Sequence, residues 1–235
     1  MKKILAFTLA ETLIVMGIIG IVSALTLPNL NSSTGEKEKV ARIKKIYKDL
    51  TDAYGRAVAV YGPVDEWFTT SDNTDALRSK RIGERISEFM KVSKTCGMAV
   101  NQGCFSKAKL YYSDGEQWED VNNGPDTDNN IYKIITADGT SIAYQASSVR
   151  HDIYVDTDGP TKGGNKIGLD RFTFTIDIDW DYKDLQLRPL EHPNTVKRTG
   201  AYTYYDEYIW AIENDNMDYL KCADKLNWQT KTSCK

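Results

Sequence analysis

The sequence predicts an α+β fold in which a long N-terminal helix packs on an antiparallel β-sheet head. Two observations predict the helix: an apolar run over residues 7–27, and apolar residues at spacings of three and four over residues 36–61. A third predicts the sheet, because apolar and polar residues alternate from Arg171 to Trp180, as in a strand with one buried and one wet face. The 235 residues suffice for one globular domain with a helical appendage.

The N-terminal apolar run contains one charged side chain, Glu11. A helix of this length rises about 30 Å, the thickness of the hydrocarbon core of a bilayer. Lys2 and Lys3 precede it, so the positive-inside rule places the N-terminus in the cytoplasm and the rest of the chain outside. A carboxylate in such a segment costs about 2.5–3.5 kcal/mol on insertion scales, so we expect Glu11 to have a function and a partner.

Three interpretations of this N-terminus compete. The first is a cleaved signal peptide, for which Val22-Ser23-Ala24 offers small residues at a cleavage site. The second is a plain membrane anchor, and the third is a short leader that is removed while the apolar segment is kept. Neither of the first two has a use for Glu11, so the carboxylate favours the third.

The residues Ala6-Phe7-Thr8-Leu9-Ala10-Glu11 resemble the processing site of the type IV pilin and type II secretion pseudopilin superfamily. The resemblance implies that a prepilin peptidase cuts between Ala6 and Phe7 and methylates the new amine. Glu11 is then the fifth residue of the mature chain, where the family places a glutamate, and Pro28 stands where many members have a helix-kinking proline. Ala6 departs from the family's usual glycine, and the resemblance covers about the first thirty residues.

This resemblance implies a pilin-like organisation. Residues 1–6 are a leader, residues 7–28 a transmembrane and assembly helix, residues 29–62 the amphipathic half of the stalk helix, and residues 63–235 an extracytoplasmic head. The implied function is that of a structural subunit of a type IV pilus or a type II secretion-type pseudopilus. It starts as a single-pass protein of the cytoplasmic membrane and then joins a periplasmic or cell-surface filament. Its partners are the prepilin peptidase, the inner-membrane assembly platform, and copies of itself or other pilins.

Charge explains how such a filament sets its register. The Glu11 carboxylate of one subunit pairs inside the membrane with the Phe7 ammonium of its neighbour, which recovers much of the cost of burying either charge. An alternative function is a minor or tip subunit that binds a surface or takes up DNA. Five aromatic residues would then form its contact surface, although such residues more often belong to a core: Tyr202, Tyr204, Tyr205, Tyr208 and Trp210. A net charge of −3 gives no reason to expect nucleic acid as a partner.

The helix over residues 36–61 has an apolar stripe and a basic remainder. The stripe is expected to pack on the head, and Gly62-Pro63 is expected to end the helix. The basic side chains favour a solvated helix face over a nucleic-acid or lipid-headgroup site; they are Lys37, Lys39, Arg42, Lys44, Lys45 and Lys48. One helix is expected from Phe7 to about Tyr61. Pro28 lacks an amide hydrogen and should bend this helix or break its hydrogen bonding, and the polar, weakly helical stretch that follows favours an interruption over residues 28–35.

The chain has four cysteines, Cys96, Cys104, Cys222 and Cys234. An even number in an exported chain predicts two disulfides, with three possible pairings. Short loops close easily, which favours Cys96–Cys104 and Cys222–Cys234. Zinc binding is the competing hypothesis, but neither pair has the spacing of a zinc site.

The rest of the head is expected to alternate short elements. An apolar helical pattern predicts a helix over residues 76–92. Residues 131–136 and 141–144 flank Asp138-Gly139, a strong hairpin signal. Further strands are expected at residues 109–113 and 151–155 and a short helix at residues 217–226, while residues 202–212 fit either a strand or a helix.

An acidic loop follows the predicted strand at residues 151–155. Asp156, Asp158 and Asp170 supply hard oxygen ligands, and Asn165 or loop carbonyls complete the set that a calcium ion requires. Turn chemistry is the alternative, since aspartate, asparagine and glycine form turns for their own reasons. Calcium is the one cofactor that the sequence suggests.

Nothing in the sequence predicts an enzyme. The only two histidines are His151, beside a predicted strand, and His192, before a proline. The sequence contains no nucleophile elbow, phosphate loop, zinc-protease motif or dinucleotide fingerprint.

Overall fold

The structure is a computed structural model that describes residues 9–69, 74–107, 110–112, 115, 125–147, 150–162, 165–177, 185–186 and 206–235. Within these ranges the side chains of residues 23–34, 150, 177, 185–186 and 206–207 are not described. The chain divides into two compact units, Met1–Glu38 and Lys39–Lys235, which are described separately below.

The first helix, α1 (Leu9–Tyr61), has 53 residues. Its backbone remains helical across Pro28 and over residues 29–35, where the sequence predicted a break. A proline removes one backbone hydrogen bond and crowds the preceding turn, and a helix can absorb this as a bend without ending. The predicted interruption is therefore wrong for the backbone of α1.

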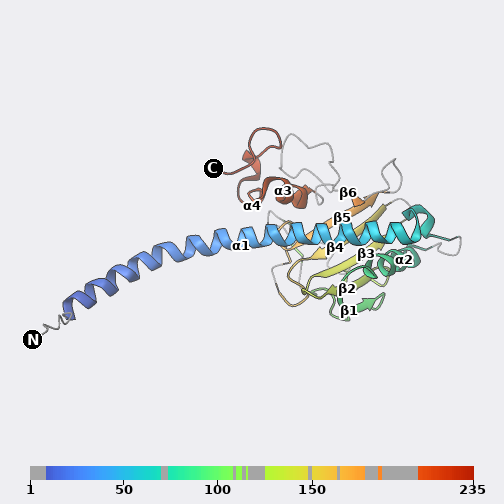
Figure 1. Cartoon of the computed structure of the whole chain (residues 1–235), viewed down its shortest axis with the longest axis horizontal. Helices are drawn as coiled ribbons and strands as arrows, with labels where there is room; N and C mark the ends of the chain where they lie inside the picture. Colours follow the sequence, from blue (N-terminus) through green and yellow to red (C-terminus); the bar gives the residue numbers. More distant parts are fainter. Residues whose placement is uncertain are drawn as a thin grey trace, which may run out of the picture. The chain divides into compact units, whose positions relative to one another are not determined.

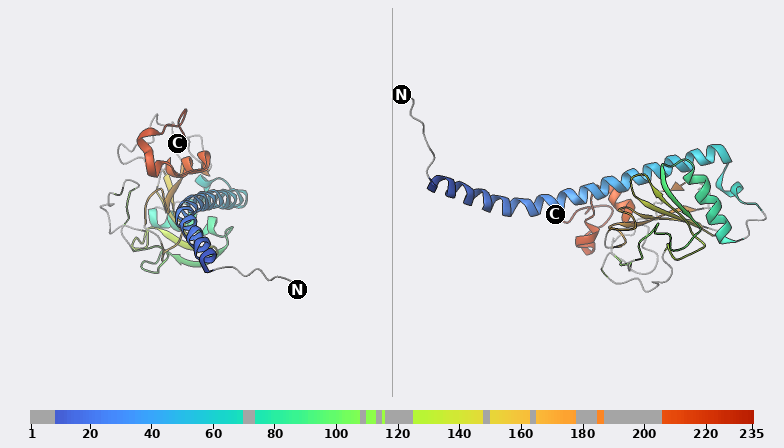
Figure 2. Two further views of the ribbon diagram at one scale, coloured as in Figure 1. Left: turned by 90° about the vertical axis from the view of Figure 1, so that its left-hand side faces the viewer. Right: turned by 90° about the horizontal axis from the view of Figure 1, so that it is seen from below.

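The part of α1 that belongs to the second unit packs on one face of the sheet (Figures 1 and 2). Its buried residues recur at the spacings that the sequence predicted: Val40, Ile43, Ile46, Leu50, Ala53, Tyr54 and Ala57. Burying one large aliphatic side chain stabilises the fold by about 1.5–3 kcal/mol. This stripe is therefore the main attachment of the helix to the head.

Six strands form the sheet in the described part of the chain, in the order β1-β2-β3-β4-β5-β6. They are β1 (Val92–Gly97), β2 (Tyr132–Thr136), β3 (Ser141–Ala146), β4 (Arg150–Asp156), β5 (Arg171–Asp177) and β6 (Leu185–Gln186). Every neighbouring pair is antiparallel, so each strand follows its predecessor along the sheet. The predicted hairpin is confirmed: Ile135 pairs with Ser141 across a turn in which Gly139 has a φ of +87°.

The two faces of the sheet differ. The face toward α1 carries the large apolar residues Ile134, Ile142, Tyr144, Ile153, Val155, Phe172, Phe174 and Ile176. On the other face, Cys104 and Phe105 pack with Ile131 and Ala143 in a smaller core cluster. Thr175 was expected to face solvent but is buried there, where it donates a hydrogen bond of 3.0 Å to Asp152. The sheet is thus covered partly on both faces.

Helix α2 (Asp75–Ser87) packs against β2 and β3. Thr74 caps its start, because its hydroxyl accepts the Leu77 amide hydrogen at 3.3 Å. The sequence predicted that this helix would run to residue 92, but it ends at Ser87 and the chain enters β1 at Val92, a strand that the sequence did not predict.

Short helical elements complete the described chain. They are η1 (Val64–Trp67), α3 (Asp206–Asn214), α4 (Tyr219–Cys222) and η2 (Ala223–Lys225). The ambiguous stretch at residues 202–212 is therefore helical from Asp206 onward. Its residues 202–205 lie outside the described part, as do residues 178–180 of the long predicted strand.

Candidate functional site

The N-terminal part of α1 presents apolar side chains in every direction. Nine large ones are between 52% and 81% exposed: Leu9, Leu13, Ile14, Val15, Met16, Ile18, Ile19, Ile21 and Val22. Glu11 lies in the first turn of the helix. Soluble surfaces rarely carry so large an apolar area, which marks a surface that another apolar phase or chain covers.

The residues of the proposed processing site are placed only in part. Glu11 is described, whereas Ala6 and Phe7 lie outside the described residues and Pro28 is described in its backbone alone. In the portion of the chain that the structure describes, no helix combines the length and apolar character needed to cross a membrane. The predicted segment at residues 7–28 extends beyond that portion at its start, so its insertion stays a prediction.

Both disulfides form as predicted. Cys96 is bonded to Cys104, eight residues away, and Cys222 is bonded to Cys234, twelve residues away. Asp126 supports the first loop, since its buried carboxylate accepts the amide hydrogens of Cys104 and Phe105 at 3.1 and 3.4 Å. Two disulfides are typical of an extracytoplasmic protein.

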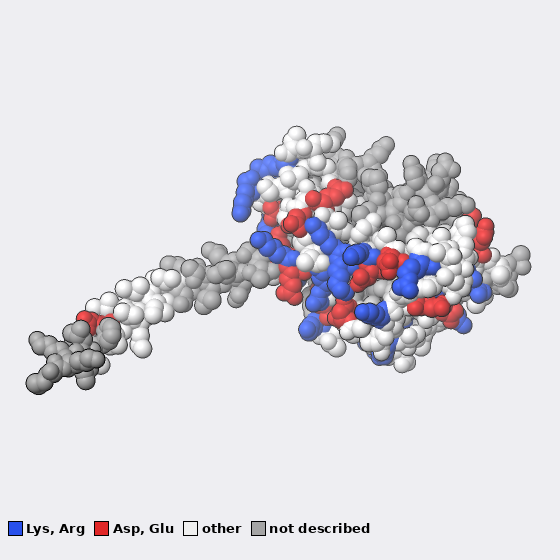
Figure 3. All heavy atoms as spheres, in the orientation of Figure 1, with Lys and Arg blue, Asp and Glu red and all other residues white. Residues whose placement is uncertain are grey.

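The basic run of α1 is partly engaged by the head. Figure 3 shows lysine and arginine side chains over this stretch of the second unit, with acidic side chains among them. Arg42 donates to the Thr157 carbonyl at 2.7 Å, and Lys44 pairs with Asp215 at 2.9 Å. Lys45 reaches Asp138 in the β2–β3 turn at 2.6 Å. These three residues thus tie α1 to the loops of the head, while the side chains of Lys44 and Lys45 remain 41% and 56% exposed on the predicted solvated face.

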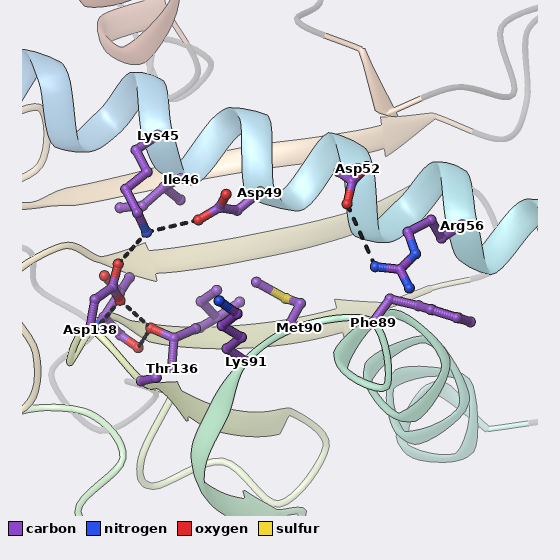
Figure 4. A pocket seen from close by; sticks show the side chains of 13 residues that line it. Lys45, Ile46, Asp49, Asp52, Arg56, Phe89, Met90, Lys91, Thr136 and Asp138 are labelled. Atoms are coloured by element: carbon purple, nitrogen blue, oxygen red, sulfur yellow. Dashed lines mark hydrogen bonds and ion pairs between the residues drawn. The ribbon is translucent and has the colours of Figure 1, made fainter.

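A groove of about 330 Å³ lies beside the Lys45–Asp138 bridge (Figure 4). Its apolar lining comes from Ile46, Phe89, Met90, Ala137 and Ile142, and charged side chains of both signs surround it. Lys45 contacts Asp49 at 2.8 Å as well as Asp138, so one ammonium pairs with two carboxylates.

Asp138 should make the stability of the head depend on pH. Partial burial raises the pKa of Asp138, but hydrogen bonds from Lys45 and Thr136 outweigh it, so the pKa lies below its usual range. A lowered pKa stabilises the fold above the unfolded value of about 3.9, and this contribution is lost as pH falls below it. We expect Asp138→Asn to lower the free energy of unfolding at pH 7 by about 0.5–1.5 kcal/mol, discounted for solvent exposure.

Denaturant titrations of both proteins at several pH values check this prediction. The difference between wild type and Asp138→Asn should shrink below about pH 4, where the Asp138 carboxylate becomes protonated in the unfolded chain but stays ionised in the folded head. Asp49→Asn is the matched control, because Asp49 shares the Lys45 ammonium but lies on the same helix. It should cost only about 0.3–0.5 kcal/mol. A difference for Asp138→Asn that stays constant from pH 7 to pH 3 would contradict this account.

The acidic loop brings the predicted calcium ligands near one another, but around an arginine. Asp156 lies 3.1 Å from Arg171, measured between carboxylate oxygen and guanidinium nitrogen. Burial raises the pKa of Asp156 to about 7, against the pull of Arg171. Burial likewise raises the pKa of Asp170. Within the described ranges, no three His, Cys, Asp or Glu side chains are grouped to hold a metal ion.

Sequence reasoning missed Arg171. The sequence could have indicated it by position: Arg171 begins β5 and precedes the buried Phe172, so its side chain lies on the side of the sheet away from α1. An arginine between the acidic loop and an alternating strand is a candidate for an internal ion pair, because charged side chains are rarely buried unless they are paired.

The described aromatic candidates for a binding surface are internal, and so is the one described histidine. Tyr208 and Trp210 are 2% and 0% exposed, so they belong to the core. Tyr202, Tyr204 and Tyr205 lie outside the described residues, as does His192. His151 is buried against the Phe68 ring, with the ring centroids 5.3 Å apart.

Comparison with known proteins identifies no relative of this chain. No protein-family model matches it, and neither does any curated protein or solved structure. The assignment of a function therefore depends on the residues and contacts described above.

Proposed function

We propose that the chain is a structural subunit of a filament of the type IV pilus or type II secretion pseudopilus class. It enters the cytoplasmic membrane as a precursor, loses residues 1–6 to a prepilin peptidase, and polymerises through its N-terminal helix. The head remains outside the cytoplasm and forms the outer surface of the filament.

One observation carries the proposal: over residues 9–22 of α1 the large apolar side chains are all exposed, and this segment contains one carboxylate, Glu11, the fifth residue after the proposed cut. Such a surface is stable only when lipid or other helices cover it. A carboxylate there needs a positive partner, and a new N-terminal amine on Phe7 of a neighbouring subunit provides one. Gly17 and Gly20 are small residues of the kind that lets membrane helices approach one another closely.

Two features of the second unit also support the proposal. The long helix packs its apolar stripe on an antiparallel sheet, which is the arrangement that the resemblance implied. Two disulfides fit a head that folds outside the cytoplasm.

Mass analysis of the N-terminal peptide of the mature protein tests the proposal. We expect the protein isolated from membranes to begin at Phe7 with a methylated amine. A protein that begins at Leu25 would be the product of signal peptidase, and one that begins at Met1 would be a plain anchor. Either result would refute the proposal, because no amine would then stand near Glu11.

A further inference from the structure

Arg171 is a buried cation at the centre of the acidic loop. Its side chain is 11% exposed, and one guanidinium nitrogen lies 3.1 Å from a carboxylate oxygen of Asp156, whose side chain is 1% exposed. Two of its N–H groups donate to the Asn165 side-chain carbonyl, at 3.1 and 2.5 Å. One residue thus engages both a carboxylate and an amide that the sequence suggested for calcium.

Two further candidate oxygens are also occupied by groups of the chain. Asp170 accepts the Lys166 amide hydrogen at 2.5 Å, and Asp156 accepts the Gly159 amide hydrogen at 3.1 Å through its other oxygen. Calcium needs six to eight oxygens at about 2.3–2.6 Å. A guanidinium within hydrogen-bonding distance of the same carboxylate repels a divalent cation, so the described residues do not fit a calcium ion.

Arg171 also joins this loop to the first disulfide loop. Its guanidinium lies over the Phe105 ring, 5.0 Å from the ring centroid. Phe105 directly follows Cys104, and the neighbouring Ser106 hydroxyl accepts a hydrogen bond from the Asn165 amide at 3.1 Å. The arginine thus contacts both loops that cover this face of the sheet.

We infer that Arg171 is the internal cation of the acidic loop: its guanidinium takes the place that a metal ion would need and locks this loop to the Cys96–Cys104 loop. The inference does not depend on how the chain assembles. It follows that the head keeps its stability without calcium, although its loop composition suggests a calcium site.

Removing the charge of Arg171 should expose this role. Asp156 Oδ2, the oxygen that pairs with Arg171, and Asp158 Oδ1 are buried and accept no hydrogen bond, and Asp170 is a third carboxylate close by. Breaking a buried pair by removing one partner strands the other charge. We expect Arg171→Gln to melt several degrees below wild type in the presence of a calcium chelator.

The test is thermal unfolding of the full-length protein in detergent, with chelator and with millimolar calcium. Wild type should melt at the same temperature in both. A wild-type melting temperature that rises by several degrees with calcium would overturn the inference, because a metal would then be the cation of the loop. This arm needs no variant, so it remains decisive if Arg171→Gln does not fold.

Two further variants separate the ion pair from general damage. Asp156→Asn combined with Arg171→Gln should recover part of the stability lost in Arg171→Gln alone, because the carboxylate that pairs with Arg171 is then no longer stranded. Arg56→Gln is the matched control, since Arg56 also has an aspartate, Asp52 at 3.9 Å, and an aromatic ring, Phe89 at 5.2 Å, but is exposed. It should change the melting temperature little. Equal losses in Arg171→Gln and Arg56→Gln, or no recovery in the double variant, would refute the role of the buried pair.

Discussion

Glu11→Ala is expected to leave membrane insertion and processing intact and to abolish entry into filaments. Replacing a carboxylate by alanine makes the apolar segment of α1 easier to insert. In the filament, however, the variant would leave the amine of a neighbouring Phe7 without a partner in an apolar surrounding. Stranding a buried charge costs about 3–5 kcal/mol, so assembly should fall about 100-fold or more.

The measurement is the fraction of head antigen recovered with sheared filaments from cells that also express wild type. Glu11→Gln keeps the size and hydrogen-bonding capacity of the side chain but not its charge, so it should fail nearly as completely if charge pairing sets the register. Leu13→Ala is the control, because Leu13 is a neighbouring exposed apolar residue, 63% exposed, without a charge. The N-terminal mass of each variant shows whether processing occurred. If processed Glu11→Ala entered filaments as readily as wild type, the pairing mechanism would be wrong.

Elements with a strong local pattern were predictable from the sequence. The apolar stripe of α1 predicts which residues are buried, because apolar residues that recur with the helical period lie on one face of the helix, as at Val40, Ile43 and Leu50. The β2–β3 hairpin follows from Asp138-Gly139, since the turn requires a positive φ that glycine adopts freely. Both disulfides follow from loop length.

Features that depend on contacts distant in sequence were not predictable. The residues of β1 do not alternate between apolar and polar, so the sequence gives no sign of a strand after α2. The hydrogen bonds with β2 stabilise this strand. From the sequence, Arg171 is expected to be a solvated residue at the start of a strand. Only the fold brings Asp156 and Phe105 into contact with its guanidinium. Likewise, the sequence of the basic face of α1 does not reveal that Lys45 pairs with Asp138 and Lys44 with Asp215, because these aspartates belong to other elements.

Substitutions of two glycines to alanine should have opposite effects on stability. Gly83 lies in α2 against β2, and a Cβ atom there would fall 2.2 Å from Cδ1 of Tyr132 and 2.8 Å from its Cβ. The ring cannot remove this clash by rotation alone, because the Cβ of Tyr132 is fixed to the backbone of β2. Helix α2 must therefore move away from the sheet, and overpacking of this kind costs about 1–3 kcal/mol.

Gly55→Ala is the matched substitution, in α1, where an added Cβ meets nothing within 4 Å. Alanine is favoured over glycine in a helix by about 1 kcal/mol, so Gly55→Ala should raise the free energy of unfolding while Gly83→Ala lowers it. Urea titration of the full-length protein in detergent measures both. Because helix propensity acts equally at the two positions, their difference isolates the close approach of α2 to Tyr132. Equal shifts for both variants would mean that α2 does not pack this closely on the sheet.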